Sequence, residues 1–374
     1  MTTKGRMSSY IFVQPHLRFG GAERQTVNVA NRLAENGHRV TVILHSGGGG
    51  LVPLLRPNVA VLVLGVESHA ATVDVARRLH AVLRALPRSL VIVKLWSSIL
   101  ACAMIDRSRS VAHHVFNYCE DLDPTDHAEY IRFGRLKQRL IGSVFRARPL
   151  LSANTHTVAD AMTDVYGLDH RPAVIPSTVD PVAIRSAAAA SPCERDDAFT
   201  VVSVGSLIRR KGLDVTLAAL EGLGVPVHWR VVGAGPLSDE LARYRDPRGL
   251  LRVSVEGAHA EPYSFIAAAD VLVHSARSEA WGIVLLEALA VGTPVLAAST
   301  IGPSEMQSLL GVRNDLLELF ENGSAADLQA RLRARLHTPR PALDDCDAYI
   351  EPVTLNHAVT RWERRAHDLL ESPA

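Results

Sequence analysis

Cysteine is scarce in this sequence and follows no pattern typical of a disulfide scaffold or a zinc site. Only four cysteines occur among 374 residues, and none forms a CxxC pair. Such scaffolds and zinc sites need several cysteines at short, regular spacings. We therefore expect reduced thiols, as in the cytoplasm.

Long apolar runs and an excess of one charge are also lacking. The first apolar run, residues 10–13, is too short for the core of a signal peptide. Charged residues, glycine and proline interrupt the two most apolar stretches, which excludes them as membrane spans. Forty basic residues balance 39 acidic ones, so the net charge of +1 gives no support for nucleic-acid binding. The expected location is the cytoplasm.

Short β-branched runs alternate with amphipathic segments along the chain. Most runs lack the alternation of a half-exposed strand, so we expect strands buried on both faces of a parallel sheet. The repeated βα pattern predicts an α/β fold with two tandem Rossmann-like domains. The expected strands are 10–13, 39–45, 59–64, 90–95 and 111–118, then 199–204, 228–232, 251–255, 271–274 and 295–297.

Prolines and small residues interrupt this pattern between residues 174 and 192, where we expect the domain boundary. The predicted domains are 1–178 and 179–354, and a helix over 355–374 is expected to pack back on the first domain. Two Rossmann-like domains would enclose a cleft between the carboxyl ends of their sheets, where ligands bind in such folds.

Two glycine-containing segments follow expected strands. Gly20 and Gly21 open a helix, where backbone N–H groups attract phosphate, although a tight turn also accounts for both glycines. Gly205 follows the first strand of the second domain, and the basic residues 209–211 come soon after it. Basic side chains at a strand's carboxyl end would bind a diphosphate strongly, or would simply be solvated.

The most specific segment spans residues 274–295. Glu279 follows a strand, Gly282 permits a close backbone approach, and Glu287 lies on the next helix. Up to roughly 12 Å can separate the two carboxylates, enough to reach a sugar at one end of a nucleotide-sugar and ribose at the other. A glutamate in an apolar helix needs a partner because an unpaired buried carboxylate is costly, and a ribose diol meets that need.

Two charged segments lie in the first domain. An acidic group after strand 111–118 would contact a hydroxyl-rich or cationic acceptor, or form a solvated loop. Residues 131–159 contain no acid, which is typical either of a helix on an anionic membrane surface or of a solvated basic face. The acids are Glu120, Asp121 and Asp123, and the basic residues are Arg132, Arg135, Lys137, Arg139, Arg146 and Arg148.

These motifs together resemble the retaining nucleotide-sugar glycosyltransferases of family 4. The resemblance rests on SEAWGIVLLEALAVGTPV, GGAER, VGSLIRRKG, AADVLVHSA and a final helix with Trp362, and it covers nearly the whole chain. It implies the GT-B fold, with the first domain on the acceptor side and the second binding the nucleotide-sugar. It also implies a bacterial hexosyltransferase of polysaccharide or antibiotic biosynthesis.

The resemblance implies roles for individual residues. Glu279 would bind hydroxyls of the donor sugar, while Lys211 and Arg210 would neutralise the departing diphosphate. No metal and no cofactor is expected, so positive side chains and helix N-termini would do the electrostatic work. The implied donor-binding residues are Gly20, Gly21, Gly205, Ser206, Arg209, Ala280, Trp281, Gly282, Ile283 and, for the ribose, Glu287.

Three places depart from the pattern of the family. Ser206 stands where arginine is common, and Ser177-Thr178 stands where Asn-Gly is usual. Cys119 or Glu120 stands where a histidine often faces the reacting sugar.

The expected function is metal-independent, retaining transfer of a sugar from a UDP- or GDP-sugar to a hydroxyl of a saccharide, lipid-linked or small-molecule acceptor. Two alternatives stay open: a nucleotide-sugar epimerase or phosphorylase of the same fold, and a non-catalytic, donor-binding partner subunit. Nucleic acid is not an expected partner. A weak peripheral contact with the inner membrane face, through residues 132–148, is one interpretation of the basic segment.

Overall fold

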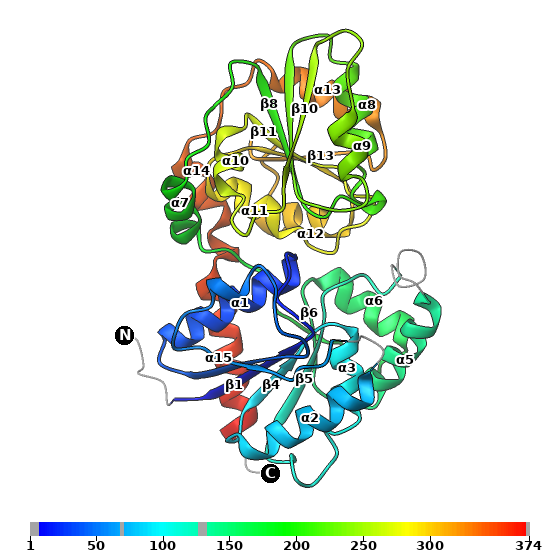
Figure 1. The fold of residues 1–374 in the computed structure, drawn as a ribbon, viewed down its shortest axis with the longest axis vertical. Helices are drawn as coiled ribbons and strands as arrows, with labels where there is room; N and C mark the ends of the chain where they lie inside the picture. The colour runs from blue at the N-terminus through cyan, green and yellow to red at the C-terminus, as the bar shows by residue number, and fades with distance from the viewer. Residues whose placement is uncertain (1–6, 68–70, 126–132, 372–374) are drawn as a thin grey trace. The chain divides into compact units, whose positions relative to one another are not determined.

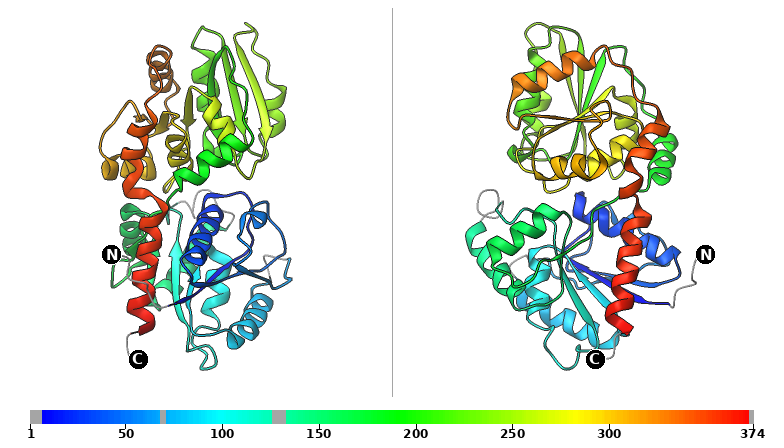
Figure 2. Two further views of the ribbon diagram at one scale, coloured as in Figure 1. Left: turned by 90° about the vertical axis from the view of Figure 1, so that its left-hand side faces the viewer. Right: turned by 180° about the vertical axis from the view of Figure 1, so that it is seen from behind.

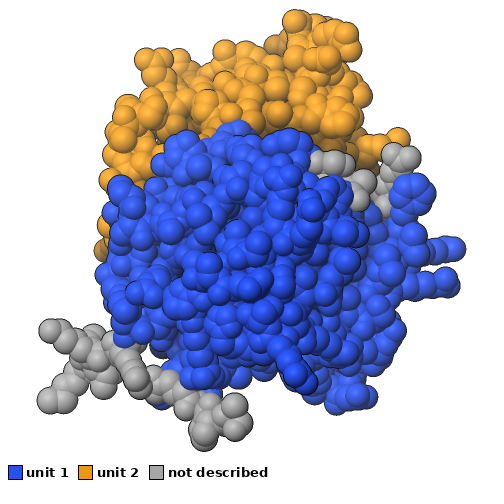
Figure 3. All heavy atoms as spheres, turned by 60° about the horizontal axis from the view of Figure 1, so that its bottom comes forward, with its two compact units in different colours: residues 1–177, 355–374 blue, residues 178–354 orange. Residues whose placement is uncertain are grey.

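The computed structural model describes residues 7–67, 71–125 and 133–371. The chain divides into two compact units: unit 1 is Met1–Ser177 with Leu355–Ala374, and unit 2 is Thr178–Thr354. Each unit is a sheet covered by helices (Figure 1), and Figure 3 colours unit 1 blue and unit 2 orange. The predicted α/β class with two Rossmann-like domains is confirmed.

The described strands of unit 1 are β1 (Ser9–Gln14), β2 (Arg39–Leu44), β3 (Ala60–Val63), β4 (Leu90–Val93), β5 (Val115–Glu120), β6 (Leu151–Ala153) and β7 (Ala173–Val174). They form a parallel sheet in the order β3-β2-β1-β4-β5-β6-β7. All four residues of β4 are buried, as expected for a central strand that helices cover on both faces. β3 is different: it is an edge strand, and all its residues are exposed.

The helices described in unit 1 are α1 (Gly21–Glu35), α2 (Thr72–Ala85), α3 (Trp96–Ala103), α5 (Gly134–Arg146), α6 (His156–Tyr166) and α15 (Leu355–Glu371). The last of these comes from the far end of the sequence and contacts α1 and β4 (Figure 2, in red). Its Arg365 donates from Nε to Asn117 Oδ1 at 2.7 Å. None of the helices in the described ranges is both long and apolar enough to cross a membrane.

The strands described in unit 2 are β8 (Phe199–Val204), β9 (Val227–Val232), β10 (Leu251–Gly257), β11 (Val271–His274), β12 (Val295–Ala298) and β13 (Leu317–Phe320). They are parallel, in the order β10-β9-β8-β11-β12-β13. The helices are α7 (Pro181–Ala190), α8 (Leu213–Glu221), α9 (Ser238–Arg243), α10 (Tyr263–Ala268), α11 (Ile283–Ala290), α12 (Ile301–Leu310), α13 (Ala325–Arg335) and α14 (Leu343–Ile350), with short 3-10 turns η2 (Arg209–Lys211) and η3 (Glu351–Val353).

Both faces of the unit 2 sheet are covered by apolar cores. Successive residues of β11 point to opposite faces, so Leu272 packs in one core with Leu285, while Val273 packs in the other with Trp229. This explains why the sequence of β11 is a continuous apolar run without alternation.

The predicted strand 111–118 is wrong at its start. Residues 111–114 form a turn, and β5 begins at Val115. His114 stabilises the turn, because its backbone N donates to Val111 O at 3.0 Å and its Nε2 lies 2.9 Å from Leu83 O. Strands β6, β7 and β13 were not predicted, and they contain only three, two and four residues.

Each sheet has a point at which the strand order reverses. In unit 1 it lies between β1 and β4, and in unit 2 between β8 and β11. Loops leaving such neighbouring strands diverge to opposite faces, so a crevice opens at the carboxyl ends of the strands. Functional side chains are therefore expected beyond Gln14 and Val93 in unit 1, and beyond Val204 and His274 in unit 2.

Gly212→Ala should destabilise unit 2. Gly212 has φ +63°, and an added Cβ would lie 2.0 Å from the carbonyl oxygen of Ser275. Relief of this clash must shift the turn that carries Lys211, so the free energy of unfolding should fall by at least about 2 kcal/mol in chemical denaturation.

Gly224→Ala is the matched control. Gly224 has φ +75°, yet an added Cβ would meet nothing within 4 Å, so only backbone strain of about 1 kcal/mol applies. An equal loss in both variants would contradict the argument from the Ser275 contact.

Candidate active site

A largely buried carboxylate lies in the loop that follows β11. The Glu279 cluster consists of Glu279, Lys211 and His274. Lys211 Nζ donates to Glu279 Oε2 at 2.5 Å, and His274 Nε2 lies 3.0 Å from the same oxygen. The carboxylate side chain is only 15% exposed, so both contacts lie largely out of bulk water.

The Glu279 cluster fixes the charge of its members. Burial alone would raise the pKa of Glu279, but the Lys211 charge and the hydrogen bond with His274 hold it well below its usual range. Burial lowers the pKa of His274, and the positive charges of Lys211 and Arg210 lower it further against the opposing effect of Glu279. At neutral pH Glu279 is therefore a carboxylate and His274 a neutral imidazole.

A hydrogen-bonded backbone turn holds Lys211 in this position. Ser275 Oγ donates toward the carbonyls of Lys211 and Gly212, at 3.1 and 2.8 Å, and receives a hydrogen bond from Thr216 Oγ1 at 2.7 Å. The side chain of Arg210 donates to Ser278 O at 2.7 Å. Turn η2 is thereby joined to the loop that carries Glu279.

Arg209 contributes mainly through its backbone. Its side chain is exposed, while its carbonyl accepts a hydrogen bond from Arg277 Nη1 at 2.9 Å. Arg277 also pairs with Asp214, with Nη2 2.5 Å from Oδ2, and this hydrogen bond lowers the pKa of Asp214. Arg277 was not named in the sequence analysis.

A small hollow adjoins the Glu279 cluster at the end of β8. It lies at the point where the strand order of unit 2 reverses. The hollow therefore brings the predicted glycine loop, the basic turn and the strand before Glu279 together. Its lining residues are Ser203, Val204, Gly205, Ser206, Leu207, Lys211, Leu213, Val273, His274 and Ser275.

The backbone after Glu279 is held by a close contact with α12. Gly302 N donates to Glu279 O at 2.9 Å, and a Cβ on Gly302 would lie 2.4 Å from Trp281 N. Ala280 and Trp281 are buried, and Gly282 at φ +84° precedes α11, whose first residue is Ile283. The backbone amides of this loop therefore lie at a helix N-terminus, as the sequence predicted.

Glu287 has a protein partner. It is 5% exposed on α11, and Tyr263 Oη of α10 donates to its Oε1 at 3.5 Å. The sequence predicted only a ribose as the partner of this carboxylate, because nothing in the sequence pairs α10 with α11. Ribose binding by Glu287 stays a prediction.

In unit 1 a carboxyl group lies against the N-terminus of α1. Gly20 precedes α1, Gly21 begins it, and a Cβ on Gly20 would lie 2.3 Å from Glu23 Oε2. The Glu23 carboxyl is therefore folded against the residue at which we expected a phosphate. Burial raises the pKa of Glu23. Phosphate binding by Gly20 and Gly21 stays a prediction.

The three acids at the end of β5 and just beyond it have separate partners. Glu120 is buried, and Tyr166 Oη donates to its Oε2 at 3.4 Å. Asp123 Oδ1 accepts from Thr125 Oγ1 at 2.7 Å. Asp121 forms an ion pair with a residue that the sequence analysis did not assign to the site. The solvated acidic loop is therefore wrong for these side chains.

That residue is Lys94, which follows β4. Its Nζ lies 3.0 Å from Asp121 Oδ2, and the two side chains are only 7% and 15% exposed. Burial alone would lower the pKa of Lys94, but Asp121 and Glu23 contribute to a net rise. The ion pair lies at the point where the strand order of unit 1 reverses.

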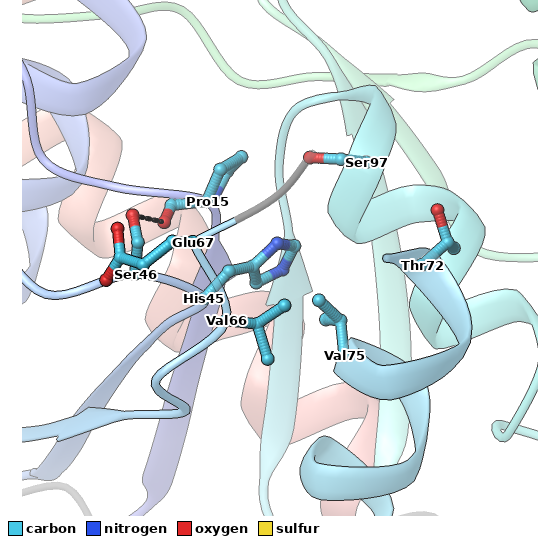
Figure 4. A pocket seen from close by; sticks show the side chains of 8 residues that line it. All are labelled: Pro15, His45, Ser46, Val66, Glu67, Thr72, Val75 and Ser97. Carbon is cyan, nitrogen blue, oxygen red and sulfur yellow. Dashed lines mark hydrogen bonds between the residues drawn. The ribbon is translucent and has the colours of Figure 1, made fainter. Parts of the chain in front are cut away.

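A second hollow lies beside this point, at the carboxyl ends of β1 and β2 (Figure 4). His45 Nε2 is 3.0 Å from Ser98 Oγ, and Ser46 Oγ donates to Pro15 O at 3.4 Å. Ser97 Oγ is buried and makes no hydrogen bond with the described residues. Polar side chains of His45, Ser46 and Ser97 therefore line this hollow.

No metal site emerges from the described ranges. Within residues 7–67, 71–125 and 133–371, no three His, Cys, Asp or Glu side chains are grouped to hold a metal ion. In unit 2, Lys211 and Arg210 are hydrogen-bonded to the loop that precedes α11.

Two family models match this chain. Residues 19–182 match the model described as Glycosyltransferase Family 4, and residues 186–350 match Glycosyl transferases group 1. The chain is 29% identical over 303 residues to the lipopolysaccharide core biosynthesis glycosyltransferase LpsE of Rhizobium meliloti, covering 77% of this chain and 79% of that protein.

Two further similarities, one to a curated relative and one to a solved structure, agree with these matches. A D-inositol 3-phosphate glycosyltransferase of Kineococcus radiotolerans is 32% identical over 187 residues, which cover 44% of this chain and 43% of that relative. Anabaena Alr3699/HepE, solved in complex with UDP-glucose, shares the fold with a TM-score of 0.73 at 17% identity, over 98% of this chain and all of that one.

The fold and the matching models define a glycosyltransferase of the two-domain GT-B class. The chain belongs to glycosyltransferase family 4, as its motifs implied, and it is a transferase enzyme.

Lys94→Met should destabilise unit 1 strongly. The substitution leaves the Asp121 carboxylate buried without its cation, which costs about 3–5 kcal/mol of unfolding free energy. Denaturant unfolding measures the loss, and the double variant Lys94→Met/Asp121→Asn should recover part of it.

Arg77→Met is the control, because Arg77 pairs with Asp74 on an exposed surface, with side chains 75% and 54% exposed. Loss of that pair should cost less than about 1 kcal/mol. If Lys94→Met lowers the free energy of unfolding no more than Arg77→Met does, the Lys94–Asp121 pair does not stabilise unit 1 as proposed.

Proposed function

We propose that this enzyme transfers a sugar, with retention and without a metal, from a UDP- or GDP-sugar to a hydroxyl of its acceptor. The observation that carries the proposal is the Glu279 cluster, which gathers a carboxylate, an ammonium and an imidazole beside the hollow at the end of β8. HepE, which shares the fold, is described in complex with UDP-glucose.

The proposed roles follow from charge and position. Glu279 accepts hydrogen bonds from hydroxyls of the donor sugar, while Lys211 and Arg210 bind the diphosphate. As the bond from the sugar carbon to the diphosphate oxygen breaks, negative charge grows on that oxygen. Positioned cations and the N-terminus of α11 stabilise the transition state, in which this charge develops, more than they stabilise the ground state. This difference lowers the barrier. Glu287 binds the ribose.

The proposed acceptor is a hydroxyl of a bacterial envelope saccharide or lipid-linked saccharide, and a small-molecule acceptor is the second candidate. LpsE is named for lipopolysaccharide core biosynthesis, which supports the first of these. Unit 1 is the proposed acceptor side. There the Lys94–Asp121 pair supplies polar groups.

Glu279→Ala should reduce transfer at least about 100-fold, because it removes the proposed ligand of the donor sugar. Nucleoside diphosphate should still raise the melting temperature of the variant, since Lys211 remains. The assay follows release of UDP or GDP from a panel of purified donors, with and without EDTA, and NMR of the product gives its anomeric configuration.

Glu240→Ala, at an exposed position of α9, is the control and should keep wild-type activity. The function is refuted if wild-type chain releases no nucleoside diphosphate from any donor. Loss of activity in EDTA would refute metal independence alone, and an inverted product would refute retention alone.

We also propose that the enzyme works at the cytoplasmic membrane face, through α5. Phe133, Leu136 and Leu140 are 67%, 58% and 43% exposed, whereas the other face of the helix is buried through Ile141 and Phe145. Large apolar side chains on the outer face of a helix are typical of helices that lie in a bilayer interface.

Charge favours an anionic bilayer as the partner of this face. Arg135 and Arg139 are exposed on the same helix. Arg146 and Arg148 are engaged within unit 1, where Arg146 donates to Tyr166 O at 2.6 Å and Arg148 pairs with Asp106 at 2.5 Å. The proposed contact is therefore smaller than the basic segment of the sequence, whose Arg132 lies outside the described residues.

Leu136→Glu/Leu140→Glu should abolish most binding to anionic vesicles, because two apolar anchors become negative charges. Co-sedimentation of the full chain with phosphatidylglycerol-containing vesicles measures binding, and pure phosphatidylcholine vesicles should bind far less. Val182→Glu is the control, since Val182 of unit 2 is 71% exposed. The proposed contact is refuted if the double variant binds the vesicles as well as the wild type does. It is also refuted if the wild type does not bind them.

A further inference from the structure

One oxygen of Glu279 receives two hydrogen bonds from donors of very different kinds. Lys211 Nζ and His274 Nε2 both contact Oε2, at 2.5 and 3.0 Å. An ionised carboxylate only accepts hydrogen bonds, so His274 Nε2 must carry its proton in this contact. The lysine donates a hydrogen bond from a charged group, while the neutral imidazole donates a directional hydrogen bond without adding charge.

The two donors also differ in mobility. His274 is the last residue of β11, pairs with Ala297 of β12, and is 5% exposed, so the sheet fixes its ring. Lys211 extends from the short turn η2 on a four-carbon stem, which can redirect its ammonium group. Only Lys211 can therefore follow a ligand without moving the sheet.

A donor diphosphate would compete with Glu279 for Lys211. This step rests on the proposed function, in which Lys211 binds the diphosphate as the sugar departs. The ammonium is drawn toward the growing charge on the leaving oxygen, and its bond to Glu279 weakens. Without a second partner, the buried carboxylate would then lose its hydrogen bonds in the protein while it must still orient the sugar.

We propose that His274 is a positioning residue that holds Glu279 in place when Lys211 turns to the donor diphosphate. His274 keeps Oε2 occupied, and Oε1, which takes part in neither contact, accepts from the sugar hydroxyls. The contact with His274 persists through the reaction, whereas the contact with Lys211 is exchanged for the diphosphate.

The charges around His274 support this assignment. Glu279, Lys211 and Arg210 influence it from the loops after β11 and β8. Burial lowers the pKa of His274, and the two cations lower it further, so the ring stays neutral at neutral pH. A neutral ring does not compete with Lys211 for the diphosphate.

A double-mutant cycle tests the proposal. In His274→Phe, withdrawal of Lys211 leaves Glu279 without a partner, so binding of UDP or GDP should weaken about tenfold or more. With Glu279→Gln already present, the neutral amide tolerates that loss, and His274→Phe should change nucleotide affinity less than about twofold. Isothermal titration calorimetry on the full chain measures all four affinities.

His274→Gln supplies the rescue, because its amide Nε2 places an N–H donor near the position of the imidazole donor. It should restore most nucleotide affinity and most of kcat, while His274→Asn, which is too short to reach, should not. If His274→Phe does not fold, His274→Asn replaces it in the cycle, with melting temperatures as the check on folding.

Each outcome decides between distinct failures. If His274→Phe weakens nucleotide binding equally in the wild-type chain and in the Glu279→Gln variant, the histidine is merely structural and the proposal is overturned. Failure of His274→Gln to rescue would also overturn it. If the wild-type chain binds neither UDP nor GDP, the proposed function fails and this inference fails with it.

Discussion

A carboxylate withdrawn from water at the end of a parallel strand is the constraint on which the active site of unit 2 depends. Glu279 can remain ionised there only because Lys211 and His274 lie against the same oxygen. The position of Lys211 depends in turn on η2 and on Gly212 after it, where an added Cβ would lie 2.0 Å from Ser275 O. The charge state of Glu279 therefore depends on the backbone geometry of the two loops that carry Lys211 and Glu279.

Unit 1 also has charged side chains at the point where its strand order reverses, but the residues are different. Where the resemblance to family 4 implies a histidine, this chain has Cys119 or Glu120, and Tyr166 donates a hydrogen bond to Glu120. The polar groups near the reversal of strand order are then Lys94, Asp121 and Glu23, an ion pair and a carboxyl of raised pKa.

The sequence predicted those parts of the molecule that depend on local pattern. Strands β8 and β11 match their predicted ranges because continuous apolar runs between loops have few other solutions. The pair Glu279 and Glu287 was singled out from its spacing and from the resemblance to family 4, and its binding role stays a prediction. Lys94 with Asp121, and Tyr263 with Glu287, join residues whose proximity depends on strand order and helix packing, which spacing does not encode. The contact of His274 with Glu279 could have been predicted from the sequence, since His274 ends a predicted strand five positions before Glu279.

Helix α15 gives unit 1 an unusual order of completion during synthesis. Its Glu363 lies 3.1 Å from the ring of His38, and its Arg365 bonds to Asn117, so its partners are translated hundreds of residues before it. While unit 2 emerges from the ribosome, the surfaces of α1 and β4 that α15 contacts remain uncovered. The first unit to be started is then the last to be finished, and a nascent chain stalled within unit 2 would expose that surface to chaperones.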